Sequence, residues 1–393
     1  MGKWVKKKLG EIGDIITGST PTTSKLDYWN GDYNFYSPAD FTDNIYCDKT
    51  ERTVTIEGLN VGRCIPENSI MVACIASIGK IAINKTMGIT NQQINSIIPF
   101  DEFNYLFLYY LLLHKSSAIK NGAAQTTIPI INKEDFSNLE VTIPSSLSEQ
   151  RRIASILSSA DKVIDSTQKL IAKYKQIKQG MMEDLLKPKE GWKKVKLGEC
   201  LRQKPDYGIN APAVEYDNNL PTYLRITDIT EDGYYSRNDI VSVSSLDALN
   251  YKLEDGDLVF ARTGASVGKT YLYNQKDGIL VFAGFLIRVR TDEQIVLSQF
   301  FKYQTQTPNY KNWIAANSMR TGQPGINGNE YGEFTFYIPY QNDIPDLPEQ
   351  CRIASILSGI DKKIESEEKV LEKYKKIKKG LMERLLNCEN INE

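Results

Sequence analysis

One short segment of the sequence has residue types that could bind a phosphate group. It reads Gly264-Ala265-Ser266-Val267-Gly268-Lys269-Thr270. A P-loop has four residues between its glycines so that its backbone N–H groups surround the phosphates, whereas this segment has three. We therefore expect a tight strand–turn–strand with a lysine at its tip, and we predict no ATP-binding site.

The residues needed for other catalytic sites are also missing. The chain has one histidine, His114, which leaves no His-pair zinc site and little room for a His-based triad. No Pro-Pro dipeptide is present to hold a flipped adenine, and neither Pro205-Asp206 nor Pro345-Asp346 is followed by the acid-x-lysine pair of a nuclease. The six cysteines include no Cys-x-x-Cys pair, which indicates reduced thiols. We predict a non-catalytic chain with no cofactor and no metal site.

Polar and basic side chains instead gather on loop segments that are suited to contact nucleic acid. Arginine pairs with guanine edges and Asn or Gln with adenine edges, while Ser, Thr and Lys contact phosphates. The candidate DNA-binding residues are Lys6, Lys8, Lys80, Asn91, Gln92, Gln93, Gln125, Thr126, Arg262, Thr263, Ser266, Lys269, Arg320 and Gln323. Each is weak evidence alone, because Asn, Gln and Thr loops are usually just solvated. The net charge of −1 restricts any such surface to a local patch.

The sequence contains an internal repeat. Residues Trp4–Glu11 (WVKKKLGE) return as Trp192–Glu199 (WKKVKLGE), and Glu149–Leu186 returns as Glu349–Leu386 with 24 identities in 38 aligned positions. The residues between head and tail agree only at short anchors. Two similar frames that carry different inserts are expected when the frame mediates assembly and the insert determines what is bound. The alternative is that the sequence of a loop-rich domain has simply diverged faster than that of the tails.

The repeated tails predict two long helices. Ser146 with Glu149 forms a capping box, and Asp346 with Glu349 takes the same places in the second copy. Apolar residues then recur at spacings of three and four over about five heptads, which is typical of a coiled-coil seam. The expected seam residues are Ile153, Leu157, Ala160, Ile164, Ile171, Tyr174, Ile177, Met181 and Leu185, and then Ile353, Leu357, Ile360, Ile364, Leu371, Tyr374, Ile377, Leu381 and Leu385. We expect the helices to pair antiparallel; the alternative is that each folds back onto its own globular domain.

The fold class that follows is α+β, with two tandem pseudo-repeats that each place a mixed globular domain before a long helix. Strand-like runs punctuated by Gly, Asn and Asp lie at 70–75, 94–99, 258–261 and 280–289, and each domain has one helix-like stretch, at 101–120 and 292–316. The expected boundaries are 1–145 and 189–345 for the globular domains, 146–188 and 346–388 for the helices, and 389–393 for a tail.

These motifs resemble one protein family over essentially the whole chain. The tails beginning EQRRIASILS and EQCRIASILS, the W-x-x-x-x-LGE heads and the ARTGASVGKT turn are similar to those of type I restriction–modification specificity subunits. The resemblance implies two target recognition domains that each read one half of a split, asymmetric double-stranded DNA site. It also implies two modification subunits, which carry adenine methyltransferase activity, and restriction motor–nuclease subunits as partners.

The resemblance further assigns the paired helices a role as spacer and subunit-docking surface. The docking residues so implied are Ile153, Leu157, Ile164, Tyr174, Ile353, Leu357, Ile364 and Tyr374. The first insert departs from the pattern, because its turn reads CIASIGKI without the Arg-Thr-Gly of the second insert. A contact made by Arg262 is therefore not expected to be symmetric.

Two other classes of protein remain open at this point. One is a non-enzymatic coiled-coil scaffold with two protein- or glycan-binding heads, and the other is a cryptic enzyme that uses the Gly-Lys turn. The longest apolar run, Tyr105–Leu113, is too short to span a bilayer, and no secretory signal is recognisable. We therefore expect a cytoplasmic protein with no membrane partner.

Overall fold

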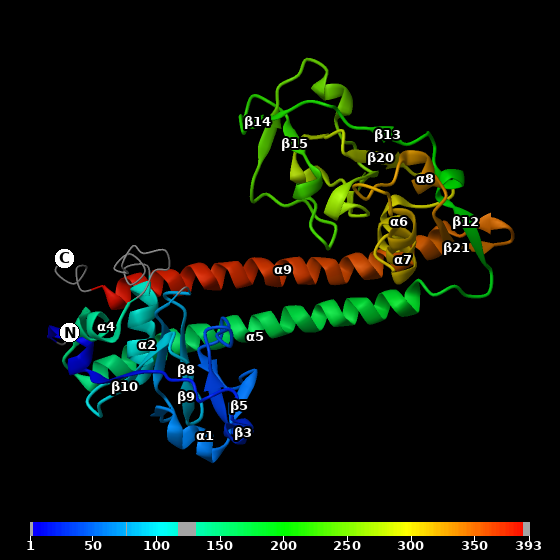
Figure 1. Ribbon diagram of the computed structural model, residues 1–393. Coiled ribbons are helices and arrows are strands. Elements are labelled where there is room, and N and C mark those ends of the chain that lie inside the picture. Colours follow the sequence, from blue (N-terminus) through cyan, green and yellow to red (C-terminus); the bar gives the residue numbers. More distant parts are fainter. Residues whose placement is uncertain (1–2, 76, 117–130, 388–393) are drawn as a thin grey trace. The chain divides into compact units, whose positions relative to one another are not determined.

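The computed structural model describes residues 3–75, 77–116 and 131–387 (Figure 1). The chain divides into two compact units: unit 1 comprises residues 1–169 and 369–393, and unit 2 comprises residues 170–368. Two long helices, α5 (Leu147–Leu185) and α9 (Leu347–Leu386), each contribute to both units. Each unit therefore contains one globular domain and one part of each long helix.

The described residues of the globular domain in unit 1 form three small β-sheets. Their strand orders are β2-β10-β7-β8-β4, β5-β3-β9-β6 and β1-β11. The strands are β1 (Trp4–Lys8), β2 (Gly13–Thr17), β3 (Trp29–Tyr36), β4 (Tyr46–Cys47), β5 (Arg52–Val54), β6 (Cys64–Ile65), β7 (Ile70–Ala73), β8 (Ile81–Asn84), β9 (Gly88–Thr90), β10 (Ile94–Pro99) and β11 (Glu140–Pro144). The helices of this domain are α1 (Ile56–Val61), α2 (Tyr105–His114) and α4 (Lys133–Asn138).

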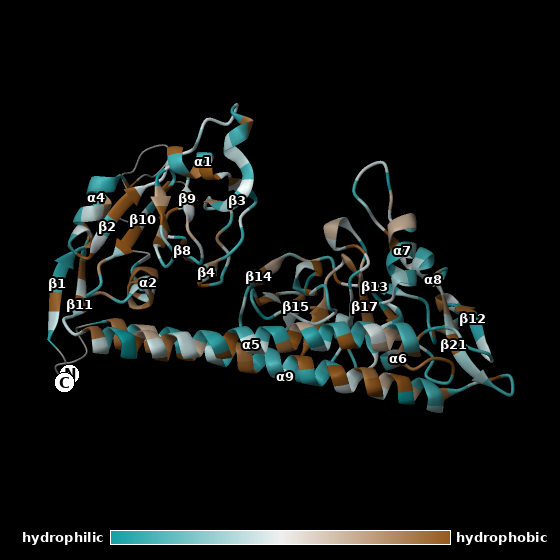
Figure 2. Ribbon diagram, turned by 90° about the horizontal axis from the view of Figure 1, so that it is seen from below, coloured by the Kyte–Doolittle hydropathy of each residue, from teal (hydrophilic) through white to brown (hydrophobic). Residues whose placement is uncertain are grey.

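Helix α2 forms the centre of the unit 1 core. Its sequence, YLFLYYLLLH, is apolar on every side, as expected of a helix that is covered all round. Asn104 caps the helix by accepting a hydrogen bond from Phe107 N, and residues 107–112 are all buried. The helix packs against β7 and β8, and Figure 2 shows the hydrophobic colouring of α2 and β10 beside the hydrophilic strand β1.

The globular domain of unit 2 is built from three further sheets in its described residues. Their orders are β12-β21-β22, β13-β20-β17-β18 and β14-β16-β15-β19. The strands are β12 (Trp192–Lys196), β13 (Asp206–Tyr207), β14 (Ala213–Glu215), β15 (Thr222–Leu224), β16 (Val241–Val243), β17 (Asp257–Ala261), β18 (Thr270–Leu272), β19 (Leu280–Phe282), β20 (Leu286–Arg290), β21 (Thr335–Gln341) and β22 (Ile344–Pro345). The helices are α6 (Ser298–Gln304), α7 (Pro308–Asn317) and α8 (Gly328–Gly332).

Two expected elements of this domain are divided in the structure. The single helix expected over 292–316 was wrong: α6 ends at Gln304, and Thr307 then caps α7 by accepting a hydrogen bond from Tyr310 N (3.3 Å). Pro308 follows the cap in the first turn, where its missing N–H is tolerated, so the chain restarts instead of continuing one helix. The run at 280–289 likewise forms two strands, β19 and β20.

The two units repeat the same connection between domain and long helix. In unit 1, β1 pairs antiparallel with β11 from Trp4↔Pro144 onwards; in unit 2, β12 pairs with β21 from Trp192↔Pro339 onwards. A buried glutamine near the start of each long helix then accepts a backbone hydrogen bond from its domain. Gln150 Oε1 accepts from Asn104 N (2.8 Å), and Gln350 Oε1 accepts from Leu297 N (2.9 Å). The predicted α+β repeat is confirmed.

The long helices pair antiparallel. In unit 1, Ile153 and Leu157 of α5 share one hydrophobic core with Leu386 at the end of α9. In unit 2, Ile353 and Leu357 of α9 share one core with Met182 near the end of α5. The same residues belong to the cores of the globular domains, so each helix both packs on its own domain and pairs with the other helix. The two arrangements that the sequence left as alternatives are therefore combined.

Two expected seam positions lie outside this packing. Ile177 and Ile377, which are equivalent in the repeat, are 40% and 44% exposed. The neighbouring seam residues Tyr174 and Tyr374 are half-buried. The face of each helix that carries Ile177 or Ile377 is available to another molecule.

Antiparallel pairing predicts a specific crosslink. Lys175 Nζ and Glu368 Oε1 lie 3.0 Å apart in unit 2, and both side chains are well exposed. With Cys64, Cys351 and Cys388 changed to serine, we expect Lys175→Cys/Glu368→Cys to be joined by a short bismaleimide, as measured by gel mobility and peptide mass. Crosslinking of Arg152→Cys with Arg352→Cys, which lie near the starts of α5 and α9, would instead indicate a parallel pair.

Candidate nucleic-acid interface

Two loops of unit 2 that are far apart in the sequence lie side by side after strand β17. Ile326 N donates a hydrogen bond to Arg262 O (2.9 Å), and Thr263 forms an antiparallel bridge with Gly325. The fold thereby brings Arg262 and Thr263 next to the loop that carries Gln323. We call residues 262–264 and 318–326 the paired loops.

Arg262 has its guanidinium group unused by any acidic side chain in the part of the chain that the structure describes. The group lies over the ring of Tyr207, 4.9 Å from its centroid. The exposed ring of Phe285 is adjacent, because Arg262 N donates to Phe285 O (3.0 Å). Stacking restricts a guanidinium group without consuming its N–H donors, so Arg262 remains able to form the bidentate contact that guanine accepts.

This state distinguishes Arg262 from five other arginines of the same domain, which are ion-paired. The five are Arg225, Arg237, Arg288, Arg290 and Arg320. Arg320, on the paired loops, forms two hydrogen bonds of 2.7 Å with the carboxylate of Glu330. A group held in this way orders its loop and has fewer donors left for a base.

The glycine–lysine turn does not form a phosphate cradle. It connects β17 and β18, and Gly264 and Gly268 adopt left-handed φ angles of 70° and 87°. The left-handed φ of Gly264 favours glycine there, whereas a Cβ atom at this position would meet only the flexible end of the Gln323 side chain (2.8 Å from Nε2). Thr270, where a P-loop would bind magnesium, is buried and hydrogen-bonded to Thr305 Oγ1 (2.8 Å). The predicted strand–turn–strand is confirmed, but the lysine expected at its tip is not there: Lys269 lies directly before β18, where its carbonyl oxygen accepts a hydrogen bond from Ala261 N (2.9 Å).

Lys269 and Ser266 belong to the end of this turn that leads into β18, where Lys269 N donates a hydrogen bond to Ser266 O (3.0 Å). Lys269 Nζ is 2.7 Å from Glu231 Oε1. Together with Ala265, Val267 and Gly268 it lines a cavity of about 550 Å³, whose lining also includes Lys178 and Asp361 of the long helices. The DNA contact predicted for Lys269 stays a prediction, and a phosphate would have to compete with Glu231 for it.

The polar residues predicted in unit 1 occupy the turn between β9 and β10. Asn91 Nδ2 donates to Gln93 Oε1 (3.1 Å), and Gln92 Oε1 accepts from Thr20 Oγ1 (2.6 Å). Gln92 is exposed, as is Lys80 just before β8. Gln125 and Thr126 lie outside the described residues.

Sequence reasoning missed two arginines of unit 1. Arg63 lies beside the predicted polar turn, because its Nη1 donates to Thr17 O (3.0 Å) and its backbone N donates to Ser19 Oγ (3.0 Å). Arg52 lies flat over the ring of Trp29, 3.8 Å from the centroid. Arg52 itself is exposed, and it resembles Arg262 in being stacked on an aromatic ring without a described carboxylate partner. Only the pairing of β3 with β5 places these side chains together.

The two basic N-terminal strands differ in how far their charges are compensated. In β1, Lys6 is exposed and Lys8 Nζ donates to Asn138 Oδ1 (3.0 Å). In β12, Lys193 and Lys196 form ion pairs of 2.7 Å with Asp343 and Glu333. The hydrogen bond and the charge of Glu333 raise the pKa of Lys196.

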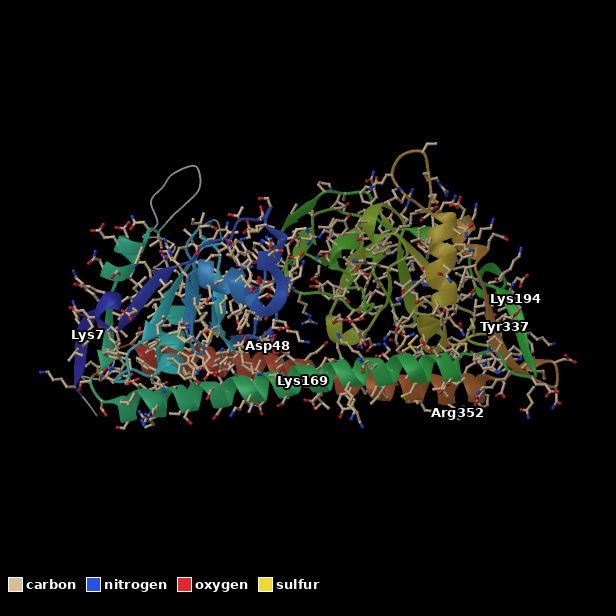
Figure 3. All side chains as sticks on the ribbon, turned by 60° about the horizontal axis from the view of Figure 1, so that its bottom comes forward. Lys7, Asp48, Lys169, Lys194, Tyr337 and Arg352 are labelled. Carbon is tan, nitrogen blue, oxygen red and sulfur yellow. The ribbon has the colours of Figure 1, made fainter. Side chains whose placement is uncertain are left out.

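All three lysines of the β12 cluster are exposed, and Lys194 is the one without an acidic partner among the described residues. It is paired in register with Tyr337 of β21, as Figure 3 shows. Because its neighbours in the cluster are paired with acids, β12 offers DNA phosphates less free positive charge than its lysine count suggests.

The remaining residues considered for catalysis have structural surroundings. His114 Nε2 lies 3.0 Å from Asn387 Oδ1, where α2 meets the end of α9. Burial raises the pKa of Cys74 to about 11 and of Cys200 to about 12, which keeps both as thiols. Within the described ranges, no three His, Cys, Asp or Glu side chains are grouped to hold a metal ion. Nor does any described helix have the length and hydropathy needed to cross a membrane.

Comparison with known proteins identifies the family. The model of the type I restriction modification DNA specificity domain matches residues 1–176 and again residues 189–376. The type I restriction enzyme MjaIX specificity subunit of Methanocaldococcus jannaschii is 28% identical over 297 residues, 67% of each chain. The MjaVIII specificity subunit of the same organism is 25% identical over 411 residues, covering 98% of this chain and 92% of that one. The chain therefore belongs to the family of type I restriction–modification specificity subunits.

The fold agrees with this assignment. The crystal structure of a type I restriction-modification S subunit from M. genitalium superimposes with a TM-score of 0.64 at 18% identity, covering 98% of this chain and 96% of that one. The family resemblance that the repeated tails and heads indicated is confirmed.

The state of Arg262 leads to a prediction about a single side chain. We expect Arg262→Ala to weaken binding to the cognate duplex by about 1–3 kcal/mol and to relax the preference at one base pair. Arg237→Ala is the matched control, because it removes the same charge from an exposed, ion-paired arginine of the same domain. Equal losses for the two variants in equilibrium titrations against a duplex library would show that Arg262 acts only through its charge.

Proposed function

We propose that the protein is the sequence-specific DNA-binding specificity subunit of a type I restriction–modification complex and reads a bipartite, asymmetric site. The observation that carries the proposal is the combination of a repeated frame with unlike heads. Both units attach a globular domain to a long helix through the same strand pair and the same buried glutamine. Between heads and tails the two domains agree only at short anchors, such as the A-S-x-G-K of 76–80 and 265–269, and Arg262 has no counterpart in the first domain. Residues 1–145 and 189–345 then serve as the two target recognition domains.

The paired loops of unit 2 are the proposed reading surface for one half-site. Arg262 is preorganised on Tyr207 with free donors, and Thr263 and Gln323 add polar groups within the same surface. Exposed apolar side chains adjoin them, including Phe285 (59% exposed) and Met319 (78% exposed). Such a mixture suits the base edges and thymine methyl groups of a major groove.

The surface around residues 91–93 is proposed to read the other half-site. It offers Gln92 and Arg63 where unit 2 offers Arg262 and Gln323, so the two half-sites are expected to differ. Arg52 on Trp29 adds a stacked guanidinium group to the same domain. Lys6 and Lys80 supply exposed positive charge for phosphates.

The chemistry of the complex is assigned to its other subunits. We propose that two modification subunits with adenine methyltransferase activity and the restriction motor–nuclease subunits bind this chain, which is itself non-catalytic, needs no cofactor and acts in the cytoplasm. Ile153, Leu157, Ile353 and Leu357 are buried within the chain, so they stabilise the frame and do not contact a partner. The exposed residues Val163, Ile177 and Ile377 are better placed to receive a partner subunit.

Exchange of one domain tests the proposal. Replacing residues 12–138 by the corresponding residues of a related subunit keeps β1, β11 and both helices, so the chain should still assemble. We expect the methylated motif, read by sequencing of genomic DNA from cells that carry the whole system, to change in one half-site only. The mirror exchange of residues 200–333 is the control and should change the other half. An exchange that altered both halves, or neither, would contradict the assignment of one domain to each half-site.

A further inference from the structure

A buried Tyr–Asp–Lys triad occurs in both units with the same geometry. In unit 1, Tyr110 Oη donates to Asp161 Oδ2 (2.7 Å), and Lys378 Nζ donates to Asp161 Oδ1 (2.5 Å). In unit 2, Tyr303 Oη donates to Asp361 Oδ2 (2.8 Å), while Lys178 Nζ forms an ion pair with Asp361 Oδ1 at 2.7 Å. We call these the first and second triads.

Each triad joins three segments of the chain. The tyrosine belongs to the globular domain, in α2 or α6. The aspartate belongs to the long helix that follows that domain, and the lysine belongs to the opposite long helix. Both lysines also lie over the ring of their tyrosine, at 5.7 Å in unit 1 and 5.6 Å in unit 2. Each triad therefore connects the globular domain of its unit to both long helices.

The triads are buried and contain charge. Tyr110 and Tyr303 are fully buried, and the side chains of Asp161 and Lys378 are only 18% and 19% exposed. Burial, together with Asp161 and Asp361, raises the pKa of both tyrosines, which therefore stay protonated and donate to the carboxylates. Burial also acts to raise the pKa of Asp361, but Lys178 and Lys302 outweigh it and the net shift is downward. A charge left unpaired at such a position costs several kcal/mol.

The apolar seam alone does not select one alignment of the helices. Its residues repeat every heptad, so a slip of seven residues, about 10 Å, would again place apolar side chains together. The triads break this equivalence. After a slip in either direction, Asp161 would face Leu371 or Leu385, and Asp361 would face Ile171 or Leu185.

We propose that the two triads are register latches, which hold α5 and α9 in one antiparallel alignment and orient each recognition domain on the helix pair. The triad residues act by positioning the helices and domains, and they are not proposed to contact DNA. Both triads specify the same alignment, since Asp161 and Asp361 are equivalent in the repeat, as are Lys178 and Lys378. The proposal also implies a fixed length for the unread gap between the two half-sites in DNA, and this consequence rests on the proposed function.

The two triads are not equally protected. Lys302, just before Tyr303, lies 3.5 Å from Asp361 Oδ2, whereas Tyr109 takes the corresponding place before Tyr110. Loss of Lys178 leaves Asp361 with a second cation, but loss of Lys378 leaves Asp161 with Tyr110 and no second cation among the described residues. We therefore expect Lys378→Met to lower the melting temperature more than Lys178→Met. Equal falls would show that Lys302 does not share the charge of Asp361.

An apolar variant of the full chain separates register from stability. Replacing a buried ion pair by apolar residues usually preserves or raises stability, so such a variant should fold. The substitutions are Tyr110→Phe, Asp161→Leu and Lys378→Leu in the first triad and Tyr303→Phe, Asp361→Leu, Lys178→Leu and Lys302→Leu in the second.

Alignment is read by three cysteine pairs and a short bismaleimide. Lys175→Cys/Glu368→Cys reports the native register; Lys175→Cys/Lys375→Cys and Gln168→Cys/Glu368→Cys report a slip of one heptad in the two directions. With one triad made apolar, we expect only the native product, because the other triad still holds the register. With both made apolar, we expect the native product to fall and a slipped product to form, and restoring either triad should reverse this.

Two results would overturn the proposal. A folded variant with both triads apolar that gave only the native product would show that the seam sets the register unaided. Slippage with a single triad removed would show that the two do not act as equivalent latches. The crosslinks require no DNA, so they are independent of the proposed function. The proposed function has a separate readout, which is the methylated DNA motif. We expect the unread gap between its half-sites to become variable in length only in the variant with both triads apolar.

Discussion

The structure depends on the antiparallel contact between the first part of each long helix and the last part of the other. Each helix has an apolar stripe that it cannot bury alone, and neither domain completes its core without the helices. The core of unit 1 includes Ile153 and Leu157 of α5 together with Leu386 of α9. The core of unit 2 includes Ile353 and Leu357 of α9 together with Met182 of α5. In unit 1 the opposite helix supplies Leu386 from the end of α9, and in unit 2 it supplies Met182, which lies shortly before the domain in the sequence. Because the frame is shared in this way, a substitution in it affects both units, whereas a substitution in an exposed loop of one domain affects that domain alone.

A second constraint is electrostatic, and it determines which side chains remain available. The charged groups of unit 2 are largely paired: Arg288 and Arg290 neutralise the fully buried carboxylate of Asp257, and Lys193, Lys196 and Lys269 have acidic partners. With a net charge of −1, the chain has no general attraction to DNA. We propose that recognition then depends on cationic groups that are stacked on aromatic rings and lack a described acidic partner, such as Arg262 and Arg52.

The sequence predicted the frame well because its signals are local. Heptad spacing, capping residues and a near-identical second copy indicated both helices, and α5 and α9 end within a few residues of the expected limits. The reading surfaces were harder to predict, because they depend on contacts between distant segments. The proximity of Gln323 to Arg262 requires the bridge at Thr263, and the stacking of Arg52 on Trp29 requires the pairing of β3 with β5. The division of helices α6 and α7 was readable in Thr307-Pro308, whereas the exposure of Ile177 and Ile377 follows from packing that no periodicity reports.

The central claim is that one repeated frame carries two unlike reading heads. Its most direct test is the motif methylated in genomic DNA by the intact system that contains the native chain, read at single-base resolution. The account predicts two different half-sites separated by a gap of fixed length with no base preference. A continuous motif, or a palindrome with identical halves, would contradict it.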